Sequence, residues 1–185
     1  MRSSTQNRDL SPLINLVHHR WSIPIIAELY ERSGAKFVTL LKQLGASRTT
    51  LSASLKHLIA LELVERNPGH GHPMRPEYLL TRKGRAIGKD CLSLTRAVQR
   101  CNEIDLAFRK WTLPLVGAIG ERSRRFNELR STLCDATPRA IAIGLKSLLQ
   151  QQWADRTLVD EYPPTAGYEL KPRGIHILEG IDRLY

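Results

Sequence analysis

Hydrophobic residues in the first sixty positions recur with the spacing of helices. Residues 10–19 and a segment beginning at Trp21 each place apolar side chains on one side of a helix, and Gly34 is expected to end the second. Residues 37–44 continue with the same spacing. After a Gly-Ala turn, Ser47 has the short polar side chain that caps a helix, and the leucines that follow it share one side. The pattern predicts successive helices, the last two joined by a tight turn.

The spacing then becomes that of a β-hairpin. Residues 63–66 and 76–80 are expected to form two paired strands, because the Gly- and Pro-rich run 67–73 between them interrupts both helix and sheet. Thr81 is a good cap for a further helix to about residue 99, which we expect to run on through Ala97–Phe108. Helices, turn, helix and hairpin in this order are typical of a winged helix-turn-helix domain.

The same order recurs 90 residues along the chain, with a one-residue shift near the middle of the repeat. The two copies agree at residue types that chance matching of apolar positions does not produce. The matched pairs include Trp21 with Trp111, Pro24 with Pro114, Tyr78 with Tyr168, and Gly84 with Gly174. We therefore predict a mainly α fold with small β-hairpin wings, made of two tandem winged helix-turn-helix domains at residues 1–99 and 100–185, with the tryptophans in the cores.

Several short motifs of the repeat resemble the HxlR-type winged-helix regulators of bacteria. They are Arg20-Trp21 and Lys110-Trp111, Phe37 with Leu40, Phe126 with Leu129, and the wing exit Glu77-Tyr78-Leu79-Leu80-Thr81. The resemblance covers nearly the whole chain, twice. It implies a transcriptional regulator that binds double-stranded operator DNA. Members usually carry one such domain and bind as two-fold dimers, so this chain is either a homodimer subunit or an intrachain pseudo-dimer.

Charge supports a polyanionic partner. The net charge is +10 and the pI about 10.0, which favours nucleic acid first and an anionic membrane surface second. Residues 1–98 hold 15 Lys and Arg against 7 Asp and Glu, whereas residues 99–185 hold 13 against 11, so the first half is expected to attract phosphate more strongly. No apolar run is long enough to span a bilayer. Three widely spaced cysteines argue against a disulfide framework and indicate a cytoplasmic protein.

The outward side of the first predicted recognition helix carries short polar and basic residues. They are Arg48, Thr49, Ser52, Ala53 and Lys56. Because the N-terminal end of such a helix meets base edges, Arg48 is expected to bond guanine, while Thr49 and Ser52 allow close approach. Lys56, further along, suits a phosphate contact. A solvated polar face is the alternative interpretation of this surface.

The first wing offers His70, His72 and Arg75, and wings contact the DNA backbone or the minor groove. The His-Gly-His spacing also suggests a metal site. Without Cys or carboxylate partners nearby that signal is weak, so we expect a hydrated loop and no metal.

The second recognition helix differs from the first at the positions that would face DNA. Arg139 and Lys146 keep some capacity for binding, but Ala142 and Ile143 stand where the first helix has Ser52 and Ala53, so polar character is lost. We expect the second domain to read DNA more weakly or to serve in assembly.

The leading hypothesis is a sequence-specific transcriptional regulator, and in particular a repressor that occupies its operator. The alternative is a protein-interaction or assembly module that kept the winged fold and lost sequence reading. An enzyme is not expected, because the sequence has no Gly-rich phosphate loop, metal-ligand cluster or nucleophile–base spacing. No cofactor is expected, and no particular small-molecule effector is indicated.

Overall fold

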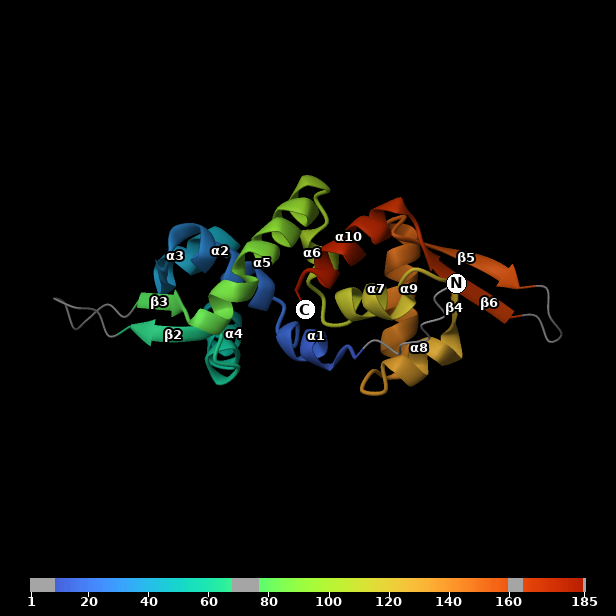
Figure 1. Ribbon diagram of the computed structural model, residues 1–185, viewed down its shortest axis with the longest axis horizontal. Coiled ribbons are helices and arrows are strands. Elements are labelled where there is room, and N and C mark those ends of the chain that lie inside the picture. Colours follow the sequence, from blue (N-terminus) through green and yellow to red (C-terminus); the bar gives the residue numbers. More distant parts are fainter. Residues whose placement is uncertain (1–8, 68–76, 160–164, 185) are drawn as a thin grey trace. The chain divides into compact units, whose positions relative to one another are not determined.

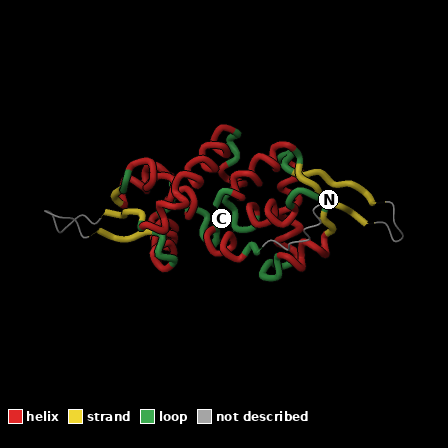
Figure 2. The backbone as a smooth tube through the Cα atoms, viewed as in Figure 1, coloured by secondary structure: helices red, strands yellow, loops and turns green. Residues whose placement is uncertain are grey.

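The structure, a computed structural model, describes residues 9–67, 77–159 and 165–184 (Figures 1 and 2). The first repeat contains α1 (Ser11–Leu16), α2 (Ser22–Arg32), β1 (Ala35–Lys36), α3 (Phe37–Leu44), α4 (Arg48–Ala60), β2 (Val64–Asn67), β3 (Glu77–Leu80) and α5 (Arg82–Arg100). The second contains α6 (Ile104–Ala107), α7 (Thr112–Ile119), β4 (Arg124–Arg125), α8 (Phe126–Thr132), α9 (Pro138–Gln150), β5 (Ala154–Val159), β6 (Thr165–Leu170) and α10 (Pro172–Asp182). The predicted fold class, mainly helical with small hairpin wings, is confirmed.

The chain folds into two compact units that do not coincide with the two repeats. The N-terminal unit comprises Leu16–Phe108 with Arg183–Tyr185, and the C-terminal unit comprises Arg109–Asp182 with Met1–Asn15. The short first helix of each repeat therefore belongs to the other repeat's unit: α1, except for its last residue, lies in the C-terminal unit and α6 in the N-terminal unit. This exchange differs from the division at residues 99 and 100 that the sequence suggested.

Packing inside each unit shows what the exchanged segments contribute. In the C-terminal unit, Leu10 and Leu13 are buried, and a methyl group added at Gly117 of α7 would lie 2.9 Å from the Leu10 Cδ2 atom. In the N-terminal unit, Leu106 and Phe108 are buried. Each unit therefore has residues of the other repeat in its core.

The connection between the repeats is not one continuous helix. Helix α5 ends at Arg100, and Asn102 takes a left-handed conformation (φ 57°) before α6 begins. Asparagine tolerates this conformation better than most residues, and a residue in this conformation cannot continue a right-handed helix. The prediction of a helix running on through Ala97–Phe108 is wrong for this reason.

Two other local expectations need correction. Ser33, not Gly34, takes the left-handed conformation that ends α2 (φ 57°), although Gly34 also has a positive φ. Trp153 is fully buried as expected, but Trp21 and Trp111 are only half-buried. Each of these two half-buried rings is covered by the preceding cation, at 5.1 Å for Arg20 and 5.2 Å for Lys110.

Each unit has a three-stranded antiparallel sheet in which a very short strand pairs with the returning wing strand. The strand orders are β1-β3-β2 and β4-β6-β5. Tyr78 lies opposite both Ala35 and Arg66, and Tyr168 lies opposite both Arg124 and Arg156. The hairpins were predicted, whereas the two-residue strands β1 and β4 were not. These strands join the start of α3 and of α8 to the wing, which fixes the helix-turn-helix against the sheet.

A glycine in the first turn of α5 and its counterpart in α10 lie against the sheet backbone. A methyl group added at Gly84 would be 2.0 Å from the Leu63 carbonyl oxygen, and one added at Gly174 would be 2.2 Å from the Trp153 carbonyl oxygen. The same two carbonyls accept hydrogen bonds from the Thr81 and Lys171 N–H groups. The backbone fixes where a Cβ atom would lie, and the atom that it would meet is a backbone carbonyl oxygen, so no rotamer change relieves either contact.

We expect Gly84→Ala and Gly174→Ala each to lower the free energy of unfolding by about 2 kcal/mol or more, because helix and sheet must separate. Denaturant titration measures this. Lys89→Ala, at an exposed position of α5, is the matched control and should change stability by less than about 0.5 kcal/mol. Equal stability of the Gly84 variant and this control would contradict the assigned contact.

Candidate nucleic-acid interface

Helix α4 begins at a well-formed cap. The Ser47 Oγ atom accepts a hydrogen bond of 3.2 Å from the Thr50 N–H, and it also lies 2.9 Å from the Thr50 hydroxyl. Gly45, with a positive φ of 62°, ends the preceding helix α3. The first residues of α4, Arg48 and Thr49, therefore start from a fixed turn and are both exposed.

The two sides of α4 separate as the sequence indicated. Leu51, Leu55 and Leu58 are buried, and the buried Ser54 hydroxyl donates to the Thr50 carbonyl at 2.8 Å. The candidate residues lie together on the opposite side. Arg48, Thr49 and Lys56 are exposed there, and Ser52 and Ala53 are half-buried. This side offers hydrogen-bonding groups, positive charge and the positive end of the helix dipole to an anionic partner.

The wing of the first unit holds three further candidate residues. His70, His72 and Arg75 lie outside the described residues. At the base of the wing, Arg66 is exposed on β2.

Helix α9 repeats the geometry with different side chains. The Thr137 hydroxyl accepts a hydrogen bond of 3.2 Å from the Ala140 N–H, and Pro138 occupies the first helical position, where its missing N–H is not needed. Arg139 and Lys146 are exposed, as is Ala142 between them. Ile143 is 54% exposed, which is high for an isoleucine in a helix that buries its other side.

Basic residues before α8 form a group that the sequence reasoning did not single out. Glu128 lies 3.5 Å from Arg124 and 3.7 Å from Arg122, and one of its carboxylate oxygens accepts a hydrogen bond of 2.7 Å from the Arg125 N–H. The backbone hydrogen bond first, and the two arginines after it, lower the pKa of Glu128 below its ordinary value. The adjacent arginines in the sequence were the available signal.

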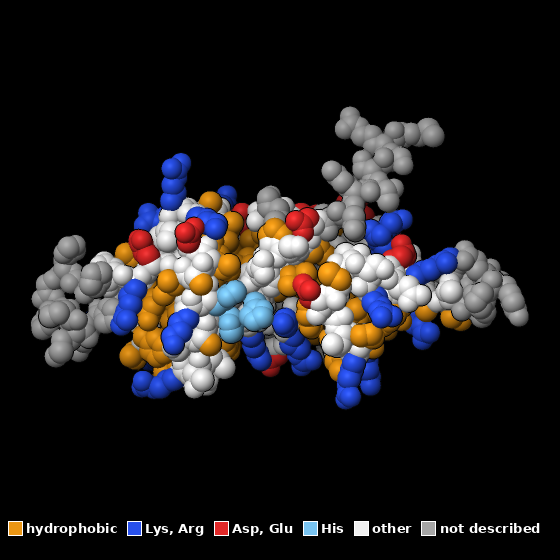
Figure 3. Space-filling model, turned by 90° about the horizontal axis from the view of Figure 1, so that it is seen from below, with side chains coloured by type: hydrophobic (Ala, Val, Ile, Leu, Met, Phe, Trp, Pro, Cys, Tyr) orange, Lys and Arg blue, Asp and Glu red, His pale blue; other side chains and the backbone are white. Residues whose placement is uncertain are grey.

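Three histidines of the N-terminal unit also come together. His57 of α4 lies against His18 and His19, with the three ring centres 5.0 to 5.4 Å apart. Figure 3 shows this group in pale blue at the surface. Within the described part of the chain, no three His, Cys, Asp or Glu side chains are placed to hold a metal ion. Through these ring contacts, His57 joins α4 to the segment before α2.

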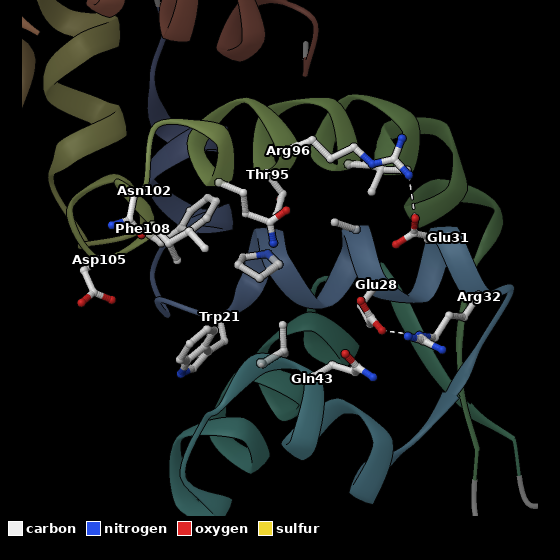
Figure 4. A pocket seen from close by; sticks show the side chains of 16 residues that line it. Trp21, Glu28, Glu31, Arg32, Gln43, Thr95, Arg96, Asn102, Asp105 and Phe108 are labelled. Atoms are coloured by element: carbon white, nitrogen blue, oxygen red, sulfur yellow. Dashed lines mark hydrogen bonds and ion pairs between the residues drawn. The ribbon is translucent and has the colours of Figure 1, made fainter.

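A hollow of about 680 Å³ lies in the N-terminal unit between α2, α3, α5 and α6 (Figure 4). Trp21 and Phe108 lie on one side of it, and Gln43 enters from the end of α3. Its carboxylates are each paired with an arginine: Glu28 with Arg32, Glu31 with Arg96, and Asp105 with Arg20. The charge of each of these three carboxylates is therefore balanced by an arginine.

The three cysteines are free thiols. Cys91 is buried in α5, and burial raises the pKa of its thiol. Cys101 and Cys134 are exposed. Separately, no helix within the described ranges is long and apolar enough to cross a membrane.

Comparison with known proteins identifies the duplicated fold. The model of the HxlR-like helix-turn-helix family matches residues 16–103 and again residues 106–185. The chain belongs to the HxlR-like helix-turn-helix family. It is therefore a member of a regulator family and not an enzyme, as expected from the sequence. The two matches also confirm that the HxlR-like domain is present as a tandem duplication.

Similar proteins include other helix-turn-helix regulators. The chain is 39% identical over 74 residues to an uncharacterised HTH-type transcriptional regulator of Mycobacterium tuberculosis (strain CDC 1551 / Oshkosh), a match that covers 40% of this chain. It spans 46% of that relative's length. A MarR-family transcriptional regulator structure from Porphyromonas gingivalis W83 is 26% identical, covering 45% of this chain and 81% of that one with a TM-score of 0.43. Apo MarR from E. coli is 19% identical, covering 78% and 82% with a TM-score of 0.37.

We expect Glu128→Ala to lower the free energy of unfolding by about 0.5–1 kcal/mol near pH 7, because α8 loses the bond to the Arg125 N–H. Since the pKa of Glu128 is lowered on folding, its contribution is complete above its ordinary pKa and disappears as the pH falls through the folded value.

Denaturant titrations from pH 7 to below pH 4 check this prediction. The difference from the wild type should shrink toward the acid end. Glu121→Ala, which removes a neighbouring exposed carboxylate, serves as the control. A difference that stays constant across this range would show that the carboxylate charge of Glu128 is not involved.

Proposed function

We propose that this protein is a sequence-specific DNA-binding transcriptional regulator, and that it represses by occupying its operator. The observation that carries this proposal is the capped N-terminal end of α4, which exposes Arg48 and Thr49 on a family helix-turn-helix. A helix presented in this way fits the major groove. The net charge of +10 favours phosphate as the first attraction.

The candidate residues have separate roles in this proposal. Arg48 bonds a guanine edge in the major groove, and Thr49 and Ser52 allow the helix to approach the bases. Lys56, one to two turns further along, neutralises a phosphate. His70, His72 and Arg75 of the wing contact the backbone or the minor groove, and Ala53 packs beside the base edges.

The exchange of first helices supports a single-chain pseudo-dimer as the binding form. Each unit needs a segment of the other repeat, as subunits of a domain-swapped dimer do. One chain then presents α4 and α9 to one operator, with Arg139 and Lys146 supplying the second contact. Such a regulator acts in the cytoplasm, and the cysteine usage of the sequence supports this.

One observation favours a second candidate, an assembly module. Ala142 and Ile143 are exposed where α4 has Ser52 and Ala53, so α9 presents a more apolar surface. In this alternative, α9 binds a protein partner instead of DNA. By binding that partner, the C-terminal unit helps to keep the N-terminal unit on its operator.

Two variants distinguish base reading from phosphate attraction. Arg48→Ala should reduce preference for the operator over altered sequences by about 5- to 100-fold, because a guanine contact is lost. Lys56→Ala should weaken binding to all sequences alike and reduce the slope of log K against log salt by about one unit. Fluorescence anisotropy on operator and scrambled duplexes at several salt concentrations measures both effects.

The control is Lys89→Ala, which removes an exposed lysine from α5, away from the proposed interface. It should bind as the wild type does. An Arg48→Ala protein that retains the sequence preference of the wild type contradicts the assigned role of α4. Binding of the wild type without any sequence preference contradicts the proposed function.

A further inference from the structure

The two recognition helices, α4 and α9, are built alike but carry different side chains on their outward sides. Both begin at a hydroxyl cap, and both bury their leucines on one side. The repeat offset of 90 residues places Ala142 at the position of Ser52, Ile143 at that of Ala53, and Lys146 at that of Lys56. Because the two helices are built alike, each matched residue lies at the same place on its helix. The substitutions therefore change only what each helix can recognise.

The outward side of α9 has an apolar centre between two cations. Arg139, Ile143 and Lys146 recur at helical spacing, so they share one side. All three are exposed, Ile143 to 54%. Arg139 and Lys146 can still attract phosphates on either side. The Ile143 side chain between them can neither donate nor accept a hydrogen bond.

This centre restricts the bases that α9 can face. All four bases present polar groups at the floor of the major groove, and covering these with Ala142 and Ile143 removes water without a replacing hydrogen bond, a loss that only an added apolar contact can offset. The C5-methyl group of thymine is the apolar feature of that groove. An isoleucine is therefore complementary to thymine and unfavourable opposite a guanine edge.

Helix α4 has the opposite preference. Arg48, Thr49 and Ser52 all carry hydrogen-bonding groups on its outward side, and Arg48 at its N-terminal end matches guanine. At the corresponding position α9 has Pro138, which has no such group. The two helices of one chain thus differ at the first position as well as at the centre.

We propose that this chain reads a non-palindromic operator, with guanine facing α4 in one half and thymine methyl groups facing Ala142 and Ile143 of α9 in the other. The proposal rests on the proposed DNA-binding function and on both helices of one chain reading the same site. A dimer of identical chains presents the same helix to both half-sites and selects a symmetric sequence. A covalent repeat is free of that constraint, because its copies diverge independently.

The first test is selection of bound duplexes from random DNA by the full-length protein. We expect an enriched site with two unlike halves, one containing guanine and the other rich in thymine. An inverted repeat overturns the inference while leaving the DNA-binding function intact. Absence of any enriched sequence overturns the proposed function itself.

The second test replaces thymine by uracil, which lacks only the C5-methyl group, in each half of the selected site. In the half facing α9 we expect about a fourfold loss of affinity for each methyl contacted, the value of one buried apolar carbon. In the half facing α4 the change should be less than twofold. Equal sensitivity of the two halves, or none in either, overturns the inference.

Matched variants assign the effect to α9. Replacing its centre by that of α4, with Ala142→Ser and Ile143→Ala together, should abolish the difference between thymine and uracil. Lys146→Ala should weaken binding overall and preserve that difference. Both changes are at exposed positions, and circular dichroism confirms that the variants are folded. A double variant that still distinguishes thymine from uracil overturns the role given to Ala142 and Ile143.

Discussion

Burial of one apolar helix holds each unit together. All eight residues of α7 are buried, and seven of the eleven residues of α2 are. A helix that is apolar on nearly every side, as α7 is, is stable only when other elements cover it completely, whereas α2 exposes the polar residues of its last turn. Helices α3, α4 and α5 and strand β3 contact α2, and α8, α9, α10 and strand β6 contact α7. The recognition helices are therefore positioned from within the core, and their outward sides are free to differ.

The exchange of first helices follows from the same requirement. Gly117 leaves a gap on α7 that the Leu10 side chain fills, so residues before the first repeat's core complete the second repeat's unit. A short helix such as α6, with four residues, is not stable in water alone and forms only where it is covered. Because of the exchange, the two units of one chain depend on each other as the subunits of a dimer do.

Local features were predictable from the sequence, and long-range partners were not. The Ser47 and Thr137 caps, the leucine stripe of α4 and both hairpins depend on neighbouring residues, so their patterns are visible in the sequence. The exchange of α1 was not predicted, because an apolar stripe shows that one side of a helix is buried but does not show which element covers it. Strand β1 was missed because two residues are too few for a period to be seen. The cluster of His57 with His18 and His19 joins positions nearly forty residues apart, and no local pattern connects them.

In the proposed complex, one chain supplies both recognition helices for one operator. The molecular mass of the complex between the full-length protein and its selected duplex, measured by native mass spectrometry or analytical ultracentrifugation, tests it most directly. A single-chain pseudo-dimer should bind as one 21.0 kDa chain per duplex across a range of protein concentrations. Two chains per duplex, with no one-chain complex at any concentration, would contradict it.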